Sequence, residues 1–526
     1  MAPLARLAIE QGFKVSGSDA ASGPRLADLE RAGARVFVGH DEGAMAVSSP
    51  CTPDVVVRSS AISDANPEVV AARRLNVPVL DRRRWLPHAT RGFDLVVAVA
   101  GTHGKTTTTS ALAQLAMRLA GVRATAIVGG VVDAFSHPEL GLQLPGGARR
   151  APGEVRVLVI EADEYGGMFL GLEPDVVVLT ALGWDHADQI RSPEAMMDMF
   201  KDFCRRIRRN GTLCFCSDCA KCAQVVQATL EGREDVEAVA FGQNDAGTSE
   251  TRHAFVVKSH GADEHAPSAR SQTFVVHDSL NADLGRLETS MLGSHNRTNL
   301  LGAVVGAAAV ARAAAAARPR PPAHTRGLRA LASEVLARTA DVVAPRRRLE
   351  ILAASSGRDA RAQRVVVVDD YAHHPTEIAA AIAATRERFP HAFLLAVVQP
   401  HTFSRVDAFR DDFCAVLASA VGPSGGGDGA VWVLDVFPAR EKRDVSPAEA
   451  AQQLARDVAA RAPVPAGVTY VGGVSQAASL VRQLCSRAMR GDDTGPAAAL
   501  GTLVVLVMGA GDVTQVARAA AAEVRE

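Results

Sequence analysis

The residues with the clearest chemical potential form one short run, Gly101-Thr102-His103-Gly104-Lys105-Thr106-Thr107. Glycines at positions 101 and 104 let backbone N–H groups approach phosphate oxygens, and the Lys105 ammonium can reach the terminal phosphates. The Thr106 hydroxyl can bind Mg²⁺. An apolar stretch, residues 95–100, comes directly before the run. The pattern predicts a buried strand, a phosphate-binding loop and a helix, and therefore a protein that binds ATP or GTP.

The match to the usual phosphate-loop pattern is partial. Val99 stands where the longer G-x-x-x-x-G-K-[ST] loop has its first glycine. A chance Gly-Lys-Thr turn is the alternative. The residues after Lys105 favour the loop, because they have the spacing of an amphipathic helix. Its predicted buried face holds Leu112, Leu115, Ala116 and Leu119.

Two carboxylate-rich clusters follow apolar stretches that we expect to be strands. Residues 155–160 lead into Glu161-Ala162-Asp163-Glu164, and a carboxylate at a strand end beside a phosphate loop is a typical Mg²⁺ ligand. Residues 176–179 lead into a group with Thr180, Asp185, His186 and Asp188. Either cluster taken alone could be a solvated loop.

The rest of the chain supplies the elements that must position these groups. A chain of 526 residues is too long for one ordinary domain. We expect three domains, at residues 1–86, at residues 87–344 with the phosphate loop, and at residues 345–526. Strands alternate with helical stretches almost throughout, which predicts an α/β protein built on parallel sheets.

Apolar patterns mark the expected core elements of the first and third blocks. In the first block, a helix through Leu4, Leu7 and Ala8 precedes strands at residues 13–17 and 55–57. The expected core strands of the third block are residues 365–368, 394–398, 431–434 and 503–507. Polar residues follow each of these strands, at the edge where α/β sheets place their ligands.

Charge and hydropathy narrow the class of protein. The 57 basic and 58 acidic residues give a net charge of −1, so charge offers no argument for nucleic-acid binding. The most apolar segment, residues 303–317, contains Arg312 and is mostly alanine, which favours a packed helix over a membrane span. Arg6 and Glu10 interrupt the one candidate signal segment. We expect a soluble cytoplasmic protein without membrane insertion.

Eight cysteines in a chain of this length do not suggest a disulfide framework. Four of them cluster at C-x-C-x₂-C-x₂-C spacing, namely Cys214, Cys216, Cys219 and Cys222. Such spacing could hold zinc or an iron–sulfur cluster. The stronger interpretation is a buried strand after the turn at residues 210–211, in which cysteine serves as a small apolar residue.

Stretches along nearly the whole chain resemble the Mur ligases, the ATP-dependent amide-forming family of peptidoglycan precursor synthesis. The matching stretches, in the family's order, are residues 16–19, 59–62, 101–107, 161–165, 185–186, 293–299, 347–348, 369–377, 399–405 and 509–512. The likeness is greatest to the branch that joins L-alanine to UDP-N-acetylmuramic acid. It implies a Rossmann-like UDP-sugar domain, a central ATP-binding domain and a Rossmann-like C-terminal domain.

The resemblance implies roles for residues of the central block. Lys105 resembles the phosphate-binding lysine of the family, and Thr106 and Glu161 resemble ligands of a Mg²⁺ ion. His186 resembles the histidine that helps hold a second Mg²⁺ near an acyl phosphate. A loop histidine bonded to a carbonyl is the alternative for that residue.

A second segment of the central block resembles the adenine site. His295 and Asn299 look like the pair that contacts the base. A helix N-terminal cap at Ser294 or Asn296 is the plainer interpretation, and both can hold at once.

For the outer blocks, the resemblance implies nucleotide and substrate contacts. Arg348 and Asp370 resemble residues that close over the phosphates and the ribose. The residues that resemble the substrate-binding set are Asp19, Ser59, Ser60, Tyr371, His373, His401 and Arg405. Of these, His373 and Arg405 join Lys105 and His186 as the expected catalytic residues. A surface loop is the alternative for each one singly.

The chain departs from the family pattern at two places. In the family, a strand and a glycine-rich turn that hold the UDP diphosphate precede the first helix. Both are missing from this sequence, because Met1 already lies in the segment expected to form that helix. We therefore expect a misassigned start or a shortened chain, weak UDP-sugar binding and a destabilised first domain. Ala181 stands where the family has asparagine, so a side-chain hydrogen bond near the metals is expected to be lost. Residues 143–153, 259–271 and 422–429 are predicted surface loops.

The expected function is a ligase that uses ATP, Mg²⁺, UDP-N-acetylmuramic acid and L-alanine, and that acts as a monomer or weak homodimer. Three alternatives to this function stay open. A degenerate nucleotide-binding scaffold would have no chemical need for all the residues named above. The branch that recycles an intact tripeptide is expected to differ over residues 399–405. An ATPase motor or kinase accounts for the phosphate loop alone.

Overall fold

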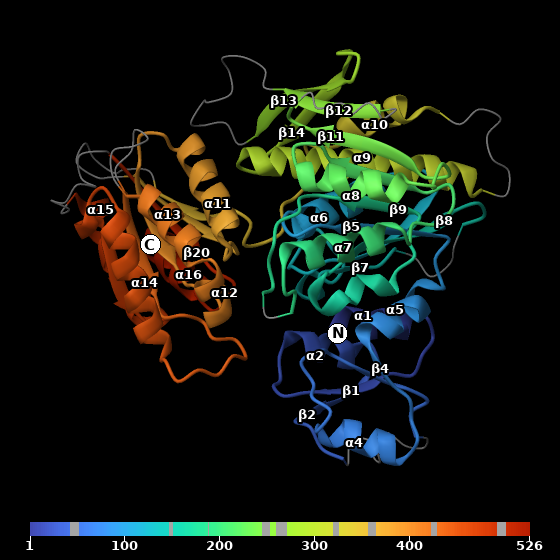
Figure 1. Ribbon diagram of the computed structural model, residues 1–526, viewed down its shortest axis with the longest axis horizontal. Helices are drawn as coiled ribbons and strands as arrows, with labels where there is room; N and C mark the ends of the chain where they lie inside the picture. Colours follow the sequence, from blue (N-terminus) through green and yellow to red (C-terminus); the bar gives the residue numbers. More distant parts are fainter. Residues whose placement is uncertain are drawn as a thin grey trace.

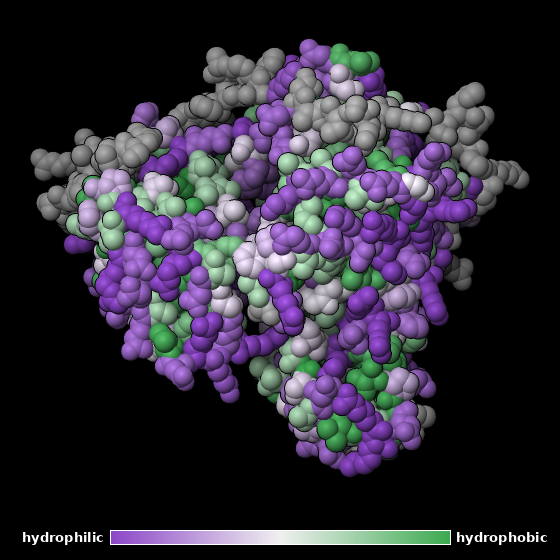
Figure 2. All heavy atoms as spheres, viewed as in Figure 1, coloured by the Kyte–Doolittle hydropathy of each residue, from purple (hydrophilic) through white to green (hydrophobic). Residues whose placement is uncertain are grey.

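The structure is a computed structural model of the 526-residue chain. It describes residues 1–42, 52–146, 151–187, 189–244, 253–258, 271–318, 326–355, 364–421, 429–491 and 501–525. Figure 1 shows three bodies, with the N-terminal body in blue, the central body in cyan to yellow and the C-terminal body in orange to red. The C-terminal body contacts the central one, and a notch separates it from the N-terminal body (Figure 2).

The N-terminal body holds two separate pairs of parallel strands. Its elements are α1 (Ala2–Glu10), β1 (Ser16–Asp19), α2 (Pro24–Arg31), β2 (Arg35–Val38), β3 (Val56–Arg58), α4 (Pro67–Arg74), β4 (Val79–Asp81) and α5 (Arg82–Thr90). Strand β1 pairs with β2, and β3 pairs with β4. The predicted helix through Leu4, Leu7 and Ala8 is confirmed as α1, which packs with α5 in one core. The strand expected at residues 13–17 begins only at Ser16, because Ser16 is the first residue paired with β2.

A ten-stranded sheet forms the central body, in the order β14-β13-β12-β11-β10-β9-β5-β8-β6-β7. Its strands are β5 (Leu95–Ala100), β6 (Val122–Ile127), β7 (Leu142–Gln143), β8 (Val155–Glu161), β9 (Val176–Leu179), β10 (Thr212–Cys216), β11 (Glu237–Gly242), β12 (His253–Lys258), β13 (Gln272–Asp278) and β14 (Asp283–Thr289). Strand β5 lies between β8 and β9 and runs parallel to both. The carboxyl ends of these three strands therefore meet at one edge of the sheet.

The parallel pairing expected for the sheets does not extend to the margins of this sheet. Strands β12, β13 and β14 pair antiparallel, and so do β6 and β7. Residues 279–282 alone connect β13 to β14. A connection that short can reverse the chain but cannot carry it back to the start of a parallel strand.

Helices cover both faces of the central sheet. They are α6 (Lys105–Ala116), α7 (Pro193–Cys204), α8 (Ala220–Leu230), α9 (Ser294–Ala316) and α10 (Leu328–Leu336). Alternate residues of β5 and β8 enter two core clusters, one with α6, α9 and α10 and the other with α7, α8, α1 and α5. The N-terminal body thus shares its core with the face that α7 and α8 cover.

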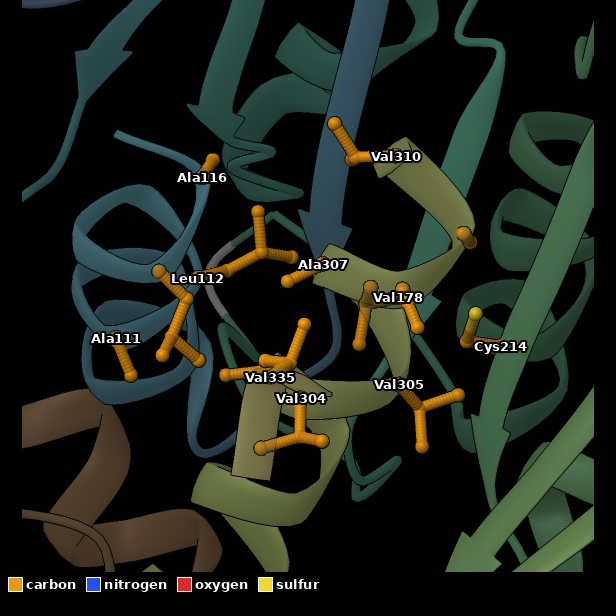
Figure 3. Close-up of a cluster of buried hydrophobic side chains, with 14 of the residues drawn as sticks. Ala111, Leu112, Ala116, Val178, Cys214, Val304, Val305, Ala307, Val310 and Val335 are labelled. Atoms are coloured by element: carbon orange, nitrogen blue, oxygen red, sulfur yellow. The ribbon is translucent and has the colours of Figure 1, made fainter. Parts of the chain in front are cut away.

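Helix α6 is buried on nearly every side rather than on one face. In Figure 3, Leu112 of α6 lies beside Ala307 of α9. The helix is enclosed between α9 and the sheet, so its threonines at positions 106–109 are buried too. It ends at Ala116, which leaves the predicted core residue Leu119 beyond it.

The long alanine-rich segment forms α9, as a packed helix. In the described part of the chain, α9 alone is long and apolar enough to cross a membrane, and 67% of its most apolar window is buried inside the protein.

The C-terminal body is a six-stranded sheet, in the order β15-β16-β20-β17-β18-β19. Its strands are β15 (Glu350–Ala354), β16 (Arg364–Asp370), β17 (Phe393–Val398), β18 (Gly429–Leu434), β19 (Val468–Gly472) and β20 (Thr502–Met508). Its helices are α11 (Pro375–Arg388), α12 (Phe403–Ala408), α13 (Arg410–Ser419), α14 (Pro447–Arg461), α15 (Val474–Arg490) and α16 (Thr514–Arg525). All four predicted core strands are confirmed, and only β15 pairs antiparallel among the described strands.

The predicted surface loops are partly within the described residues. Gln143 belongs to β7, and residues 144–146 and 151–153 form neither helix nor strand. Residues 259–270 and 422–428 lie outside the described residues, as does Asp188.

Candidate active site

The phosphate loop has the backbone that its glycines predict. Gly101 and Gly104 have φ angles of 138° and 86°, in the region that favours glycine. Gly104 caps α6, so Lys105 is the first residue of that helix. Unbonded N–H groups at the first turn of a helix attract anions. The loop is therefore built to receive phosphate oxygens.

We expect Gly104→Ala to lower any nucleotide-dependent activity by about 10²-fold, because a small displacement of a reacting group has an effect of that order. An added Cβ would overlap the Asn299 side-chain oxygen, and the left-handed backbone disfavours alanine. Gly153→Ala is the matched control, since Gly153 has φ +84° and nothing within 4 Å of the added carbon. The control should lose only about 1 kcal/mol of stability. ADP release and thermal unfolding measure both effects, and an active Gly104→Ala protein would contradict the loop geometry.

The Lys105 side chain is held over the phosphate loop by two loop carbonyls and an acidic partner. Its Nζ donates to the carbonyl oxygens of Gly101 at 2.7 Å and Thr102 at 3.0 Å, and to Glu164 Oε1 at 3.0 Å. Burial lowers the pKa of Lys105, but the charge and hydrogen bond of Glu164 with the nearby acidic residues together outweigh burial, and the net pKa is raised. The side chain therefore stays an ammonium ion, as phosphate binding requires.

Glu164 also contacts His186. The His186 Nε2 lies 3.4 Å from Glu164 Oε1, and the glutamate side chain is 1% exposed. Burial raises the pKa of Glu164, yet Lys105 and His186 together bring it below its usual value. Burial lowers the pKa of His186, but the bond to Glu164 and the charges of Asp185 and Glu164 together raise it overall. One buried carboxylate thus balances two cationic groups beside the phosphate loop.

Thr106 and Glu161 form a donor pair that suits Mg²⁺. The Thr106 hydroxyl donates to Glu161 Oε1 at 2.9 Å, and the Gly129 N–H donates to Glu161 Oε2 at 2.6 Å. Oxygen donors from one hydroxyl and one carboxylate, completed by phosphate oxygens and water, are the usual Mg²⁺ environment. Arg348 Nη2 also lies 3.2 Å from the Thr106 hydroxyl, so a third-block cation reaches the same point.

The predicted adenine pair lies on α9 beside the loop. Asn299 faces Gly104 and donates to Asn296 Oδ1 at 3.2 Å. Burial, and then the charge of Arg348, lower the pKa of His295 to about 4, so this ring is neutral near pH 7. Neither predicted cap is confirmed, because α9 begins at Ser294 and no side chain caps it.

Arg405 and Asp185 join the C-terminal and central bodies. The guanidinium donates three hydrogen bonds to the carboxylate, from Nη2 at 2.8 and 3.1 Å and from Nε at 3.1 Å. Their side chains are only 7% and 8% exposed. Burial raises the pKa of Asp185, but Arg405 and the nearby histidines together lower it below its usual range, so the carboxyl is ionised.

Histidines line the C-terminal side of the same contact. Arg405 Nη1 lies 3.0 Å from His401 Nδ1, and the His373 and His401 rings lie 5.4 Å apart. Burial, followed by His373 and Arg405, lowers the pKa of His401 to about 3. Burial also lowers the pKa of His373, whose Nδ1 lies 2.9 Å from the Tyr371 carbonyl oxygen. These rings are neutral at pH 7 and can donate or accept hydrogen bonds.

A second link between the bodies starts from the phosphate loop itself. His103 Nδ1 lies 3.2 Å from Glu377 Oε1, and His103 Nε2 lies 2.8 Å from the Thr376 hydroxyl. Glu377 also completes a capping box with His374 at the start of α11. The N-terminus of α11 therefore rests directly on the phosphate loop.

Asp370 organises the turn that carries Arg348. Its carboxylate accepts the Leu349 N–H at 2.7 Å and the Ala372 N–H at 2.6 Å. Burial raises the pKa of Asp370 to about 6. The Arg348 guanidinium lies over the Tyr371 ring, 5.4 Å from its centre. Both oxygens are engaged with backbone, and the predicted ribose contact stays a prediction.

Four residues at this site that are not glycine have a positive φ angle. The φ angles are +57° at His186, +60° at Arg347, +51° at Leu349 and +62° at Thr402. Such conformations cost about 1–3 kcal/mol each, and they persist where the surrounding structure holds them.

The remaining predicted substrate residues belong to the N-terminal body, whereas the residues described above belong to the central and C-terminal bodies. Asp19 ends β1, and its Oδ1 lies 3.4 Å from the Ala21 N–H. Ser59 and Ser60 directly follow β3, where the Ser59 hydroxyl accepts the Ala61 N–H at 3.3 Å. Their substrate roles stay predictions.

Ala181 and the cysteines take backbone and core roles. The Ala181 carbonyl accepts the Thr102 N–H at 2.6 Å, and the consequence of lacking asparagine there stays a prediction. The buried strand expected at Cys214 and Cys216 is confirmed as β10, and Figure 3 shows Cys214 within the core. Among the described residues, no group of three or more histidine, cysteine, aspartate or glutamate side chains could hold a metal ion. The structure therefore does not support metal binding by the four cysteines.

Sequence reasoning gave no separate role to Glu164 or Glu377. Glu164 sits in a cluster where only Glu161 resembles a ligand, and its partners lie far along the chain. Glu377 had a local signal, because it stands three residues after His374 and just before an apolar run.

Three family models match the chain in order. They are the Mur ligase family catalytic domain over residues 1–94, the Mur ligase middle domain over residues 99–307, and the Mur ligase glutamate ligase domain over residues 347–511. Among curated proteins, the UDP-N-acetylmuramate–L-alanine ligase of Frankia casuarinae is 33% identical, covering 98% of this chain and 94% of that protein. The protein of the same name from Roseiflexus castenholzii is 32% identical, covering 92% and 90%.

Solved structures show the same fold. The UDP-N-acetylmuramate–alanine ligase of Thermotoga maritima superposes with a TM-score of 0.65 at 20% identity, covering 100% of this chain and 96% of that one. A murein peptide ligase from Psychrobacter arcticus gives a TM-score of 0.59 at 20% identity, with coverage of 100% and 96%.

Proposed function

This chain belongs to the Mur ligase family, and on that premise we propose that it joins L-alanine to UDP-N-acetylmuramic acid at the expense of ATP. The observation that carries the proposal is the match of nearly the whole chain to relatives named for that reaction. The site supports it, because a phosphate loop on the central body faces cations and histidines from the C-terminal body. The product belongs to peptidoglycan precursor synthesis.

The chemistry explains why two bodies share the site. A carboxylate is a poor acyl donor until one oxygen becomes part of a leaving group. The lactyl carboxylate attacks the γ-phosphorus of ATP, which breaks the bond to ADP and gives an acyl phosphate. The amine of L-alanine then attacks the acyl carbon, loses a proton, and phosphate leaves as the amide forms. Contact between the bodies excludes water, which would otherwise hydrolyse the acyl phosphate.

The chain's own groups have distinct tasks in this scheme. Lys105, released from Glu164, neutralises charge on the terminal phosphates, and Arg348 adds a second cation. Thr106, Glu161 and His186 are the residues proposed to hold Mg²⁺, which shields phosphate charge when bound. Arg405 and the neutral His373 face the acyl centre, where they stabilise a negative oxygen. His401 positions Arg405 through the 3.0 Å contact.

The domain organisation that we propose follows this division of labour. The N-terminal domain, with Asp19, Ser59 and Ser60, takes the UDP-sugar. Residue 86 lies within α5, so the first boundary is best placed in the turn at residues 91–94. The second boundary stays near residue 344, between α10 and β15. We propose a cytoplasmic enzyme that acts as a monomer or weak homodimer.

Release of ADP by the purified chain tests the proposed reaction. With Mg-ATP and UDP-N-acetylmuramic acid, we expect steady turnover only when L-alanine is added. In parallel reactions, either glycine or the tripeptide of peptidoglycan recycling replaces L-alanine, and the sugar-nucleotide is kept. Turnover with the tripeptide and UDP-N-acetylmuramic acid, but not with L-alanine, would establish the recycling branch instead. ATP binding without turnover under any condition would establish a nucleotide-binding scaffold.

A further inference from the structure

Cys219 and Cys222 form a thiol pair at the N-terminus of α8. Cys219 caps the helix, and its carbonyl oxygen accepts the Cys222 N–H at 2.9 Å. The Cys219 side chain is partly exposed, whereas Cys222 is fully buried. Two cysteines at this spacing on the first turn of a helix are placed for a disulfide, with the outer one open to attack. Neither has a task in the proposed ligation.

The environment divides the two thiols into an anion and an acid. A hydrogen bond from the Cys222 thiol is the main reason that the pKa of Cys219 falls to about 5. The Leu182 N–H donates to the same sulfur at 3.4 Å, and the helix N-terminus also favours negative charge. Burial raises the pKa of Cys222 well above its usual value. Cys219 is therefore the nucleophile near pH 7, and Cys222 keeps its proton.

The neighbouring cysteines lack this chemistry. Burial raises the pKa of Cys214 and of Cys216 to about 12. Both belong to β10, with 0% and 5% of their surfaces exposed. A reagent in solution should therefore distinguish Cys219 from them.

The thiol pair contacts the segment that supports the phosphate loop. Cys222 Sγ lies 3.8 Å from the Thr180 carbonyl oxygen, and Cys219 contacts Leu182. On the other side of this segment, the Thr180 hydroxyl donates to the His103 carbonyl at 2.6 Å. The Thr102 hydroxyl donates to the Gly183 carbonyl at 2.7 Å. Residues 180–183 thus connect the two sulfurs to the loop through direct hydrogen bonds.

We propose that Cys219 and Cys222 form a reversible disulfide that weakens nucleotide binding at the phosphate loop, with a low-molecular-weight disulfide as the oxidant. The Cys219 thiolate attacks one sulfur of the reagent, forms a mixed disulfide and releases one thiolate. Cys222 loses its proton to that thiolate and attacks the Cys219 sulfur, which releases the second thiolate. The two protein thiols are oxidised, and the reagent is reduced to two thiols. The link to ATP rests on the proposed function.

Disulfide formation changes the support of the loop. The Leu182 N–H, which donates to the Cys219 sulfur at 3.4 Å, loses its anionic acceptor. We expect the affinity for ATP to fall about tenfold, which corresponds to the loss of one ordinary hydrogen bond or slightly more.

The test uses the full chain with Cys51→Ser, since Cys51 lies outside the described residues. The protein is treated with 2-hydroxyethyl disulfide at pH 7, and intact mass, peptide mapping and binding of a fluorescent ATP analogue with Mg²⁺ are measured. We expect a bond between Cys219 and Cys222, about tenfold weaker binding, and recovery with dithiothreitol. Cys222→Ser should stop at the mixed disulfide on residue 219, and Cys219→Ser should not react. Cys216→Ala is the matched control and should behave like the parent.

Two results would overturn the proposal. One is first reaction at a cysteine other than Cys219, and the other is an oxidised pair with unchanged affinity for the analogue. The mass measurement does not depend on nucleotide. If the chain forms the disulfide on oxidation but binds no ATP even in its reduced state, the proposed function and the switch are both refuted. A chain that turns over normally but forms no such bond would refute the switch alone.

Discussion

Lys105→Met is expected to lower L-alanine-dependent ADP release by about 10³-fold, the upper range for removing one group that stabilises transition-state charge. Methionine keeps most of the side-chain volume but removes the ammonium ion. No other lysine is within the described loop, and Arg348 reaches the Thr106 hydroxyl rather than the Lys105 position. The rate at saturating ATP measures the loss, which should appear in kcat because charge on the phosphates grows during transfer.

The same substitution leaves Glu164 with one cationic partner instead of two. Breaking a buried ion pair costs about 3–5 kcal/mol, so thermal unfolding should occur at a lower temperature. Adding Glu164→Gln should recover stability without recovering activity. Lys201→Met is the matched control, since Lys201 makes only a surface pair with Asp198 on α7. Equal rates for Lys105→Met and the parent would refute phosphate transfer at this loop.

Arg405→Ala is expected to lower kcat/KM by about 10²-fold or more, because it breaks the contact between the C-terminal and central bodies. The three hydrogen bonds to Asp185 are almost fully buried, and removing one partner leaves an ionised carboxylate without compensation. A loss of about 3–5 kcal/mol corresponds to two to four orders of magnitude in the closed population. ADP release measures the rate, and small-angle scattering should report a larger radius of gyration.

Arg410→Ala supplies the contrast for that prediction. Arg410 pairs with Asp457 within the C-terminal body, and the two side chains are 34% and 30% exposed. Such a pair contributes about 0–1 kcal/mol, so this variant should keep its activity. A double-mutant cycle with Asp185→Ala separates closure from catalysis. If Arg405 acts only through Asp185, the double variant loses no more than Asp185→Ala does. A greater loss would assign Arg405 a second contact, with the substrate.

Local patterns were sufficient for the phosphate loop and for most core strands. The run from β5 through Gly104 to α6 follows from glycine backbone, an apolar strand and helix spacing, all within about twenty residues. The four core strands of the C-terminal body are continuous apolar runs, which fits strands buried on both faces. Where a pattern depended on a distant neighbour, it was less reliable. The one-faced helix predicted after Lys105 is enclosed because α9 covers its outer side.

Pairing across the site shows the same limit. Asp185 and Arg405 are 220 positions apart, and His103 and Glu377 are 274 apart. Resemblance to a family brought their residue types to attention, but it did not show that each joins two bodies. Glu164 had no signal of its own, because its importance comes from burial between Lys105 and His186. The separate reactivities of Cys219 and Cys222 follow from the hydrogen bond between them and from the deeper burial of Cys222.

The amino-acid sequence by itself determined the phosphate loop, the class of fold, the family and the residue types available at each strand end. Those properties depend on backbone preference, hydropathy period and spacing, which act between residues close along the chain. Tertiary structure alone decided which carboxylate meets Lys105, which arginine crosses to the central body and which thiol is an anion. The first two depend on the approach of segments 59 and 220 positions apart, and the third depends on the unequal burial of Cys219 and Cys222. Only the folded chain sets these properties, because the strength of a charge interaction is set by distance and by exclusion of water.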